Sequence, residues 1–371
     1  MAPLACSSSP VLLLPLEETT SFMHNNVLRQ NLKKTIPIGS SYGWLILLDE
    51  TTSEPFLLNP FDQTKIQLPK KSTFPHITSI KTHSFSGQEE EHLTVEYKGS
   101  SAARVFTPME DKRPLLSIKK AVLSANPSTN KDFVVFVLYG EDDKVAYCRN
   151  GDKDWRNLGG QCGPCYDITC LNGMMYALGK RLSVERWDSS SLKKTGVIHP
   201  PLPRGLFDDR EEFPADLYAR KWYIIPFKSG EMFFVVRHIG EFVTEEGKVV
   251  YEEAMYEDGD MMICPYRTMG FRVYKLDMWT ETWEPVKTLN GRVVFLGGNH
   301  SVSLLGSDHP NRKPDCIYFT DDYWDRVDED YSYGGHDMGV FCLKDNTFEH
   351  FLDFHLQKFT PPPFWLIPDS S

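Results

Sequence analysis

Two cysteines separated by two residues form the most recognisable chemical motif in this sequence. Cys162-Gly-Pro-Cys165 has the spacing of a thiol–disulfide exchange pair. Such a pair needs its first cysteine at a helix N-terminus, where the helix dipole lowers the pKa of the thiol. The residues that follow, YDITCLNG, are rich in β-branched and aromatic types and end in an Asn-Gly turn, which predicts a strand. We therefore interpret the motif as a turn between strands, with redox activity of Cys162 and Cys165 as the alternative.

The eight cysteines give no other chemical signal. A zinc site would need two further ligands at regular spacing, and Cys170 alone does not supply them. The first residues have no basic segment before a long apolar core, so they do not predict a secretory signal peptide. We expect reduced thiols, a cytoplasmic or nuclear location, no bound metal and no cofactor.

Acidic residues are the second group with chemical potential, and they are concentrated in two stretches. The whole chain carries 40 Lys+Arg and 51 Asp+Glu, a net charge of −11. Residues 241–260 hold eight acids and one Lys (−7), and residues 321–330 hold six acids and one Arg (−5). These sum to −12, which leaves +1 for the rest of the chain. Such stretches form either solvated loops or an acidic docking surface for a basic partner. No calcium-loop motif accompanies them.

Carboxylates also raise the question of catalysis. Two carboxylates on opposite sides of a central pocket can hydrolyse a glycosidic bond, and Asp277, Asp321, Asp322 and Asp337 are the candidates. No spacing rule pairs them, and the sequence has no nucleophile elbow, zinc-protease or phosphate-loop motif. We expect that the protein is not an enzyme. The alternative is a carbohydrate- or small-molecule-binding protein, with hydrolytic activity as one version of it, that uses carboxylates in a central channel.

The elements that position these residues are short strands. Apolar runs of four to eight residues recur between Gly, Asn, Asp and Pro signals, and helical periodicity is scarce. They group into six clusters, at 10–37, 37–69, 117–159, 166–200, 221–289 and 293–352. Units of about 40 residues with four short strands are typical of propeller blades. We predict an all-β fold, a single β-propeller over residues 10–367 after a disordered segment 1–9. Six blades are expected, with five or seven blades, or two stacked sandwiches, as alternatives.

Composition excludes two classes of partner. The isoelectric point near 5.5 does not fit nucleic acid, because phosphate binding requires a basic surface. No run approaches 18 apolar residues, so we expect no membrane span.

An ordered set of short words resembles one protein family, the plant F-box-associated β-propeller domain. Each word is weak alone, but together they cover residues 10–367. The words are Gly39-Ser-Ser-Tyr-Gly-Trp-Leu-Ile-Leu-Leu-Asp49, Leu57-Leu-Asn-Pro60, Ile66-Gln-Leu-Pro69, Lys120-Ala-Val-Leu-Ser124, Val273-Tyr-Lys-Leu-Asp277, Val294-Phe-Leu-Gly297, Cys316-Ile-Tyr-Phe-Thr-Asp-Asp322, Asp337-Met-Gly-Val-Phe341 and Pro361-Pro-Pro-Phe-Trp365.

The resemblance implies a propeller that recruits a target protein, joined in the family to an F-box that binds a Skp-type adaptor of a ubiquitin ligase. It also implies plant kinases of the shaggy/glycogen synthase kinase-3 type as one class of target. Here only nine residues precede the first expected strand. Leu14-Pro-Leu-Glu17 has the form of an F-box start, but it lies within that strand rather than at the head of a helix. We therefore expect no F-box in this sequence and no direct link to a Skp-type adaptor.

Protein recognition is the function that these observations favour, through loops 241–265 and 321–336. In the second loop aromatic residues alternate with acids, a mixture that suits an interaction hot spot. The predicted partner-binding residues are Asp321, Asp322, Tyr323, Trp324, Asp328, Glu329, Asp330, Tyr331 and Tyr333. The expected partner has a basic surface.

Overall fold

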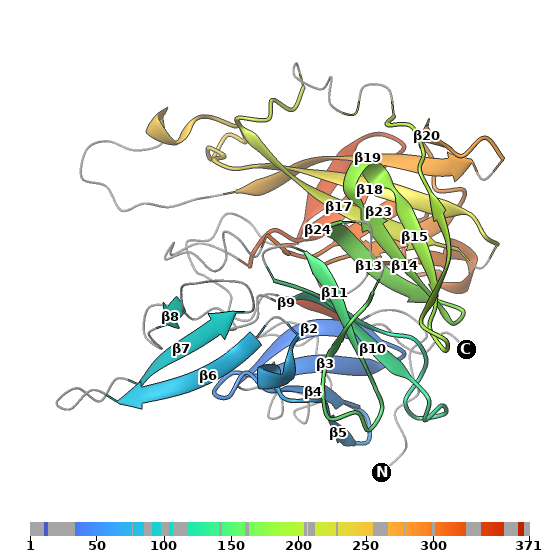
Figure 1. Ribbon diagram of the computed structural model, residues 1–371. Helices are drawn as coiled ribbons and strands as arrows, with labels where there is room; N and C mark the ends of the chain where they lie inside the picture. Colours follow the sequence, from blue (N-terminus) through green and yellow to red (C-terminus); the bar gives the residue numbers. More distant parts are fainter. Residues whose placement is uncertain are drawn as a thin grey trace, which may run out of the picture.

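The structure is a computed structural model in which most of the chain is placed well enough to describe. The described residues are 11–13, 34–75, 77–84, 91–97, 104–106, 118–140, 143–159, 163–203, 206, 212–227, 229–254, 266–277, 279–298, 301–323, 335–351 and 363–366, with the side chains of 11–13 and 78–106 left aside. Within these residues the chain forms β-strands and four short 3₁₀ turns (Figure 1). The all-β prediction is confirmed.

Five sheets of four or five strands form the blades of a β-propeller. Blade 1 consists of β2 (Thr35–Ser41), β3 (Trp44–Asp49), β4 (Pro55–Leu58) and β5 (Lys65–Gln67). Blade 2 consists of β9 (Ile118–Leu123), β10 (Val134–Tyr139), β11 (Lys144–Arg149) and β12 (Arg156–Asn157). Blade 3 consists of β13 (Cys165–Leu171), β14 (Met174–Gly179), β15 (Val184–Asp188) and β16 (Lys193–Ile198).

The last two blades are longer. Blade 4 consists of β17 (Tyr218–Pro226), β18 (Met232–Gly240), β19 (Arg267–Asp277) and β20 (Thr282–Val286). Blade 5 has the order β22-β21-β23-β24-β25, in which β21 (Arg292–Leu296) pairs parallel with β23 (Cys316–Phe319). Its other strands are β22 (Ser301–Leu305), β24 (Gly339–Cys342) and β25 (Thr347–His350).

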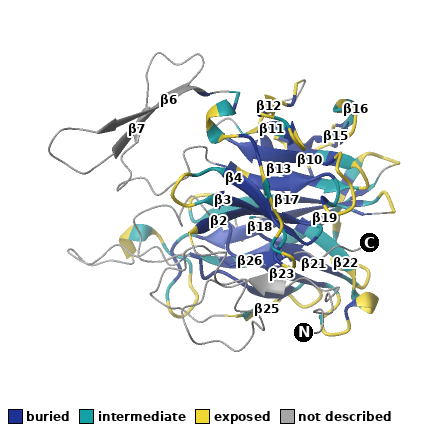
Figure 2. Cartoon of the chain, turned by 90° about the horizontal axis from the view of Figure 1, so that it is seen from below, coloured by how far each residue is buried: buried dark blue, intermediate teal, exposed yellow. Residues whose placement is uncertain are grey.

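Central strands of the blades are buried on both faces, as their continuous apolar runs require. Every residue of β10 (VVFVLY) is buried, and every residue of β18 (MFFVVRHIG) is buried as well. Figure 2 shows these buried strands in the middle of the molecule, with exposed turns around them. Neighbouring blades share apolar clusters, so each blade is stabilised by the next one rather than by a core of its own.

The ring closes between blade 5 and blade 1. There β26 (Phe364–Leu366) pairs antiparallel with β1 (Val11–Leu13). Phe364 and Leu366 pack on blade 1, and Trp365 packs on blade 5 and donates its indole N–H to the Leu296 carbonyl at 2.9 Å. The N-terminal strand thus meets the C-terminal segment at the seam.

Six blades were predicted, and that number is wrong: the described residues form five. The expected first cluster, 10–37, does not make a blade, because β1 pairs with β26 at the seam and Thr35–Ser41 belongs to blade 1. Five was the stated alternative. Between blades 1 and 2 a separate three-stranded sheet is formed by β6 (Ile77–Ser84), β7 (Glu91–Tyr97) and β8 (Arg104–Phe106).

A buried ion pair, which we call the inner cluster, joins the strands that line the middle of the ring. Lys120 on β9 donates from Nζ to Asp167 Oδ1 on β13 at 2.6 Å and to Ser301 Oγ on β22 at 3.1 Å. The other oxygen of Asp167 accepts from the Ile224 backbone N–H on β17 at 2.9 Å. Lys120 and Asp167 are 4% and 3% exposed, so four blades meet at a charge pair shielded from water.

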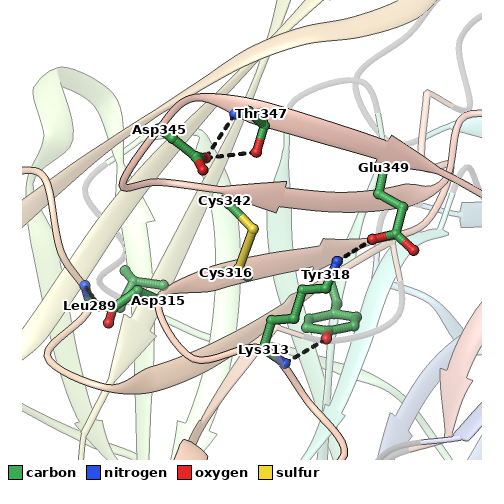
Figure 3. The surroundings of a disulfide bond; sticks show 9 residues. All are labelled: Leu289, Lys313, Asp315, Cys316, Tyr318, Cys342, Asp345, Thr347 and Glu349. Atoms are coloured by element: carbon green, nitrogen blue, oxygen red, sulfur yellow. Dashed lines mark hydrogen bonds and ion pairs between the residues drawn. A yellow bond between two sulfur atoms is a disulfide. The ribbon is translucent and has the colours of Figure 1, made fainter.

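One cysteine pair differs from the expectation of reduced thiols. Cys316 on β23 and Cys342 on β24 are direct cross-strand partners and form a disulfide (Figure 3). Their Cα atoms lie 4.2 Å apart, because antiparallel pairing brings the two side chains together on one face of blade 5. Cys148 and Cys165 are buried. Sequence spacing gave no hint of this pair, since strand register alone creates it.

Candidate protein-interaction face

The two acidic stretches leave the propeller at neighbouring positions. The first connects β18 to β19 in blade 4, and the second connects β23 to β24 in blade 5. Tyr266, at the end of the first, and Tyr323, at the start of the second, pack edge to face with ring centroids 5.2 Å apart. The Tyr323 hydroxyl donates to Glu241 Oε1 at 2.8 Å. The two loops, about 80 residues apart in the sequence, therefore start from one place on the propeller, which we call their shared root.

Arg237 on β18 lies at the centre of that root, in what we call the root cluster. Its guanidinium is fully buried, and each of its five N–H groups has an acceptor. Nη1 donates to Asp322 Oδ1 and to the Thr320 carbonyl, both at 2.8 Å. Nη2 donates to Asp337 Oδ2 at 2.8 Å and to the Asp337 carbonyl at 3.1 Å. Nε donates to Thr268 Oγ1 at 2.6 Å.

This arrangement explains why a charge sits within the apolar run of β18. Burial disfavours the guanidinium ion, but attraction by Asp337, Tyr223 and Asp322 outweighs burial and raises the pKa of Arg237. Tyr223 on β17 adds a hydrogen bond from its hydroxyl to Asp322 Oδ2 at 2.8 Å. The Phe319 ring lies 4.9 Å from the guanidinium carbon. The root cluster therefore fastens both ends of the second acidic loop to blade 4.

Asp321 ties the two ends of that loop to each other. Its Oδ1 accepts from the Tyr323 N–H at 3.1 Å, and its Oδ2 accepts from the Asp337 N–H at 3.2 Å. The hydroxyl of Tyr266 donates to the same Oδ2 at 2.7 Å, which adds the first loop to the junction. The single carboxylate of Asp321 thus holds three segments, and the loop starts and ends in a fixed position.

The protonation states at the root differ from ordinary ones. Burial and the nearby Asp337 carboxylate raise the pKa of Asp321 to about 6, and Arg237 opposes this increase. Burial and Asp321 raise the pKa of the Tyr266 hydroxyl well above its usual value. Burial lowers the pKa of His336 to about 4, so its ring is neutral at pH 7. The neutral His336 donates from Nε2 to the Tyr266 carbonyl at 2.9 Å.

Acids of the first loop that the structure describes reach the surface beside this root. Residues 241–250 form a small hairpin closed by pairing of Val243 with Val249. Residues 241–254 carry five Glu and one Lys, a net −4. Glu245, Glu246 and Glu253 are exposed, and Tyr251 is exposed as well, with its hydroxyl bonded to Asp216 at 2.6 Å. The face thus presents clustered acids together with an aromatic side chain.

Comparison with known proteins places the chain in a family. The model of the family described as KIB1-4 beta-propeller matches residues 13–342, which is most of the chain. The chain belongs to the KIB1-4 beta-propeller family. The predicted resemblance to plant F-box-associated propellers is confirmed, because related curated proteins are F-box proteins of a plant.

Two such relatives come from Arabidopsis thaliana. F-box protein SKIP23 is 25% identical over 88% of this chain and 74% of its own length. Putative F-box protein At5g55150 is 26% identical over 55% of this chain and 48% of its own length. Among solved structures, the N-terminal domain of Nup159 aligns with a TM-score of 0.27 and 12% identity over 76% of this chain and 69% of that one. A TM-score this low carries no argument about function.

Placement of the predicted partner-binding residues in this KIB1-4 propeller separates them into two groups. Asp321, Asp322 and Tyr323 are 1%, 4% and 7% exposed, and their polar atoms are used within the root. Their direct contact with a partner stays a prediction, and their burial favours a supporting role. The remaining six lie outside the described residues, namely Trp324, Asp328, Glu329, Asp330, Tyr331 and Tyr333.

The candidate catalytic carboxylates of the KIB1-4 propeller do not face one another across a channel. Asp322 and Asp337 are bonded to Arg237, and Asp321 bonds to backbone at the same root. Asp277 ends β19, whereas Thr268, the partner of Asp337, begins it, so about 30 Å of strand separates them. Within the described part of the chain, no group of His, Cys, Asp and Glu has a metal-binding arrangement. No helix there is long and apolar enough to cross a bilayer.

The Cys-Gly-Pro-Cys motif leads into a strand, as predicted. Cys165 is buried and begins β13, with no helix following it, whereas Cys162 lies outside the described residues. Cys165 therefore does not lie at a helix N-terminus, the position that lowers the pKa of a thiol. The redox alternative itself stays untested.

Sequence reasoning missed Arg237, Thr268, Tyr223 and Tyr266 as the supports of the site. One signal was present, because Arg237 is the sole charged residue in the last eight positions of the run EMFFVVRHIG and a buried charge requires partners. Its partners lie 31 to 100 residues away along the chain, so only the fold identifies them.

Proposed function

We propose that this protein recognises a basic-surfaced partner protein through the face formed by its two acidic loops. The observation that carries this proposal is the shared root, where the described ends of both strongly acidic stretches are in contact. Acids on one face give a concentrated negative potential, which accelerates encounter with a basic surface and fixes its orientation. Dispersed solvated loops would not need Arg237 and three carboxylates to hold them together.

A role in protein–protein interaction also agrees with the relatives. The related proteins named above are F-box proteins, and the family resemblance implies targets such as shaggy/glycogen synthase kinase-3-type kinases. We propose this kinase class as the first partner to test. We further propose that residues 10–367 act without direct contact to a Skp-type adaptor, because Leu14-Pro-Leu-Glu17, which has the form of an F-box start, lies within the first expected strand rather than at the head of a helix.

Binding rather than catalysis is the proposed mode of action. Each of the described candidate carboxylates already has protein partners, either a guanidinium or backbone N–H groups. A catalytic pair would instead aim at an open position where substrate atoms could lie.

The test compares two triple variants that remove the same charge from different faces. Glu245→Gln/Glu246→Gln/Glu253→Gln neutralises three exposed acids of the first loop. Glu50→Gln/Asp132→Asn/Asp154→Asn neutralises three exposed acids on blades 1 and 2. Binding to a purified shaggy/glycogen synthase kinase-3-type kinase is measured by biolayer interferometry at low and moderate salt.

The loop variant should bind about tenfold more weakly at low salt, if each charge contributes about 0.5 kcal/mol, and the control should stay within about twofold. The difference should shrink as salt is added. Equal weakening of both variants would show that net charge, not this face, governs binding. Strong binding whose affinity changes neither with salt nor in either variant would mean that the partner binds elsewhere on the protein.

A further inference from the structure

Blade 4 presents an unusual side chain at the end opposite the acidic loops. Trp279, in the turn between β19 and β20, is 95% exposed. A tryptophan normally buries a large part of its apolar surface, and exposed tryptophans are frequent at the centres of protein interfaces. The two ends of β19 are about 30 Å apart, so this position is distinct from the root of the acidic loops.

The turn that carries Trp279 is ordered by its own side chains. Asp277 Oδ1 accepts from the Trp279 N–H at 2.8 Å and from the Thr280 N–H at 3.3 Å. These backbone hydrogen bonds lower the pKa of Asp277, so the carboxylate is ionised at neutral pH. A turn fixed in this way holds the indole in one region of space, which reduces the entropy lost when a ligand packs on it.

Equivalent turns show that the fold itself does not require tryptophan there. In blade 3, Asp188 Oδ1 accepts from the Ser191 N–H at 2.7 Å, and the residue two places after the aspartate is Ser190. In blade 1, Asn59 Oδ1 accepts from the Phe61 N–H at 2.9 Å, and Phe61 is 51% exposed. Serine, phenylalanine and tryptophan therefore all fit this turn. The exposed indole needs an explanation outside folding.

A hollow lies beside the indole. Its volume is about 560 Å³, and Trp279 and Val286 supply apolar surface to its wall, whereas the Leu276 side chain is buried on the other face of the blade. The ionisable groups on the wall are Glu231, Asp277, Glu284 and Lys275, a net −2. Lys275 is already bonded to Glu231, which leaves the exposed Glu284 and the ionised Asp277 to set the sign of the site. An aromatic face with excess negative charge is complementary to a cationic side chain.

We propose that this hollow binds an arginine or lysine side chain from an extended segment of a partner protein. The cationic group would stack on the face of Trp279, and Glu284 would pair with its charge at the rim. The aliphatic stem would contact Val286. This second contact point lies on the opposite end of blade 4 and does not depend on the acidic loops.

The test uses the full chain labelled with 5-fluorotryptophan. The sequence has eight tryptophans, and Trp279→Ser identifies the ¹⁹F resonance of Trp279 by its loss. Serine is chosen because the equivalent turn of blade 3 has serine at this position, so folding should be retained. The probes are the peptide Gly-Arg-Gly-Arg-Gly and the same peptide with citrulline, which keeps the shape of arginine but is uncharged.

The Trp279 resonance should shift saturably with the arginine peptide and should not move with the citrulline peptide. Glu284→Gln should weaken the fitted affinity about three- to tenfold, whereas Phe61→Ser, the matched change in blade 1, should leave it unchanged. The proposal would be overturned if the chemical shift of Trp279 did not change with millimolar arginine peptide, or if it changed equally with the citrulline peptide. An unchanged affinity in Glu284→Gln would overturn the assigned rim contact.

Discussion

The two buried ionic clusters of the propeller use charge in different ways. The inner cluster pairs one ammonium, Lys120, with one carboxylate, Asp167, where the strands of four blades meet. The root cluster pairs one guanidinium, Arg237, with two carboxylates, and a third carboxylate, Asp321, lies beside them. The inner cluster is balanced, whereas the root cluster carries an excess of negative groups.

The difference teaches what each cluster is for. A balanced pair surrounded by apolar strands fixes the position of the blades relative to one another. All of its members lie on strands, so the pair does not depend on a loop. The excess carboxylate at the root accepts hydrogen bonds from backbone N–H groups at both ends of a loop, so the cluster positions that loop. Burial raises the pKa of Asp321 at the root and of Asp167 in the inner cluster, so both clusters should respond to pH. Three predictions test this contrast, from the largest effect to the smallest.

Removing the cation of the root cluster should have the largest effect. Arg237→Met leaves Asp322 and Asp337 buried without their positive partner, which should lower the free energy of unfolding by about 3–5 kcal/mol. Urea denaturation followed by fluorescence measures the change, and limited proteolysis checks whether residues 324–334 become more susceptible. Arg149→Met, at an exposed arginine of blade 2, is the control and should cost less than about 0.5 kcal/mol. A small loss in Arg237→Met would show that the root does not hold the loop.

Neighbouring lysines on β9 test the inner cluster. Lys120→Met should cost about 2–4 kcal/mol, because Asp167 loses its buried partner. Lys119, the adjacent residue, forms an ion pair with Asp143 at the surface, and Lys119→Met should cost no more than about 0.5 kcal/mol.

The double variant Lys120→Met/Asp167→Asn sharpens this test. It should recover at least part of the loss, because no uncompensated charge remains. The denaturation curves of Lys119→Met, Lys120→Met and the double variant therefore separate the free energy of the buried charge pair from the cost of leaving one charge buried alone. If Lys119→Met and Lys120→Met were equally stable, the inner cluster would contribute nothing beyond a surface pair.

The pH response of the root cluster can be tested with the smallest change in structure. Asp321 has a folded-state pKa of about 6 against an ordinary value of 3.8, so the unfolded chain releases this proton at lower pH than the folded chain. Its contribution to stability is complete below about pH 4 and is lost as pH rises to about 6, a loss of about 2–3 kcal/mol.

Asp321→Asn should flatten this part of the curve of unfolding free energy against pH. Asp188→Asn is the control, because hydrogen bonds from Ser191 and Ser190 lower the pKa of Asp188 to about 2, and its titration ends below this window. A wild-type curve that does not fall between about pH 4 and about pH 6, or an Asp321→Asn curve that falls equally, would contradict the excess-charge description of the root.

The architecture could be predicted from sequence because its signals are local. Runs such as VVFVLY at 134–139 and turn signals such as Asn172-Gly173 identify strands and hairpins directly. The blade count could not be predicted, because β1 resembles the first strand of a blade yet pairs with β26, more than 350 residues later. Strand partners at that distance leave no local trace.

The site was predicted in outline but not in detail. The acidic stretches predicted a partner surface, which stays a prediction, and their roots do lie together. Asp321 and Asp322 were predicted to bind the partner, whereas the structure buries both in the root, where Asp322 bonds to Arg237. Charge clustering shows net charge, but only long-range packing shows which of the acids are neutralised inside the protein.

The seam at β26 has a consequence for how the ring assembles. Val11 and Leu366 are register partners at a sequence separation of 366 minus 11, or 355. Closing a loop of that length costs about 5 kcal/mol of chain entropy, so this contact should form late, after the hairpins of each blade. Until then the five sheets make an open arc, with one side of blade 1 and one side of blade 5 lacking their neighbour. Three residues, Phe364–Leu366, thus convert a chain of blades into a closed ring.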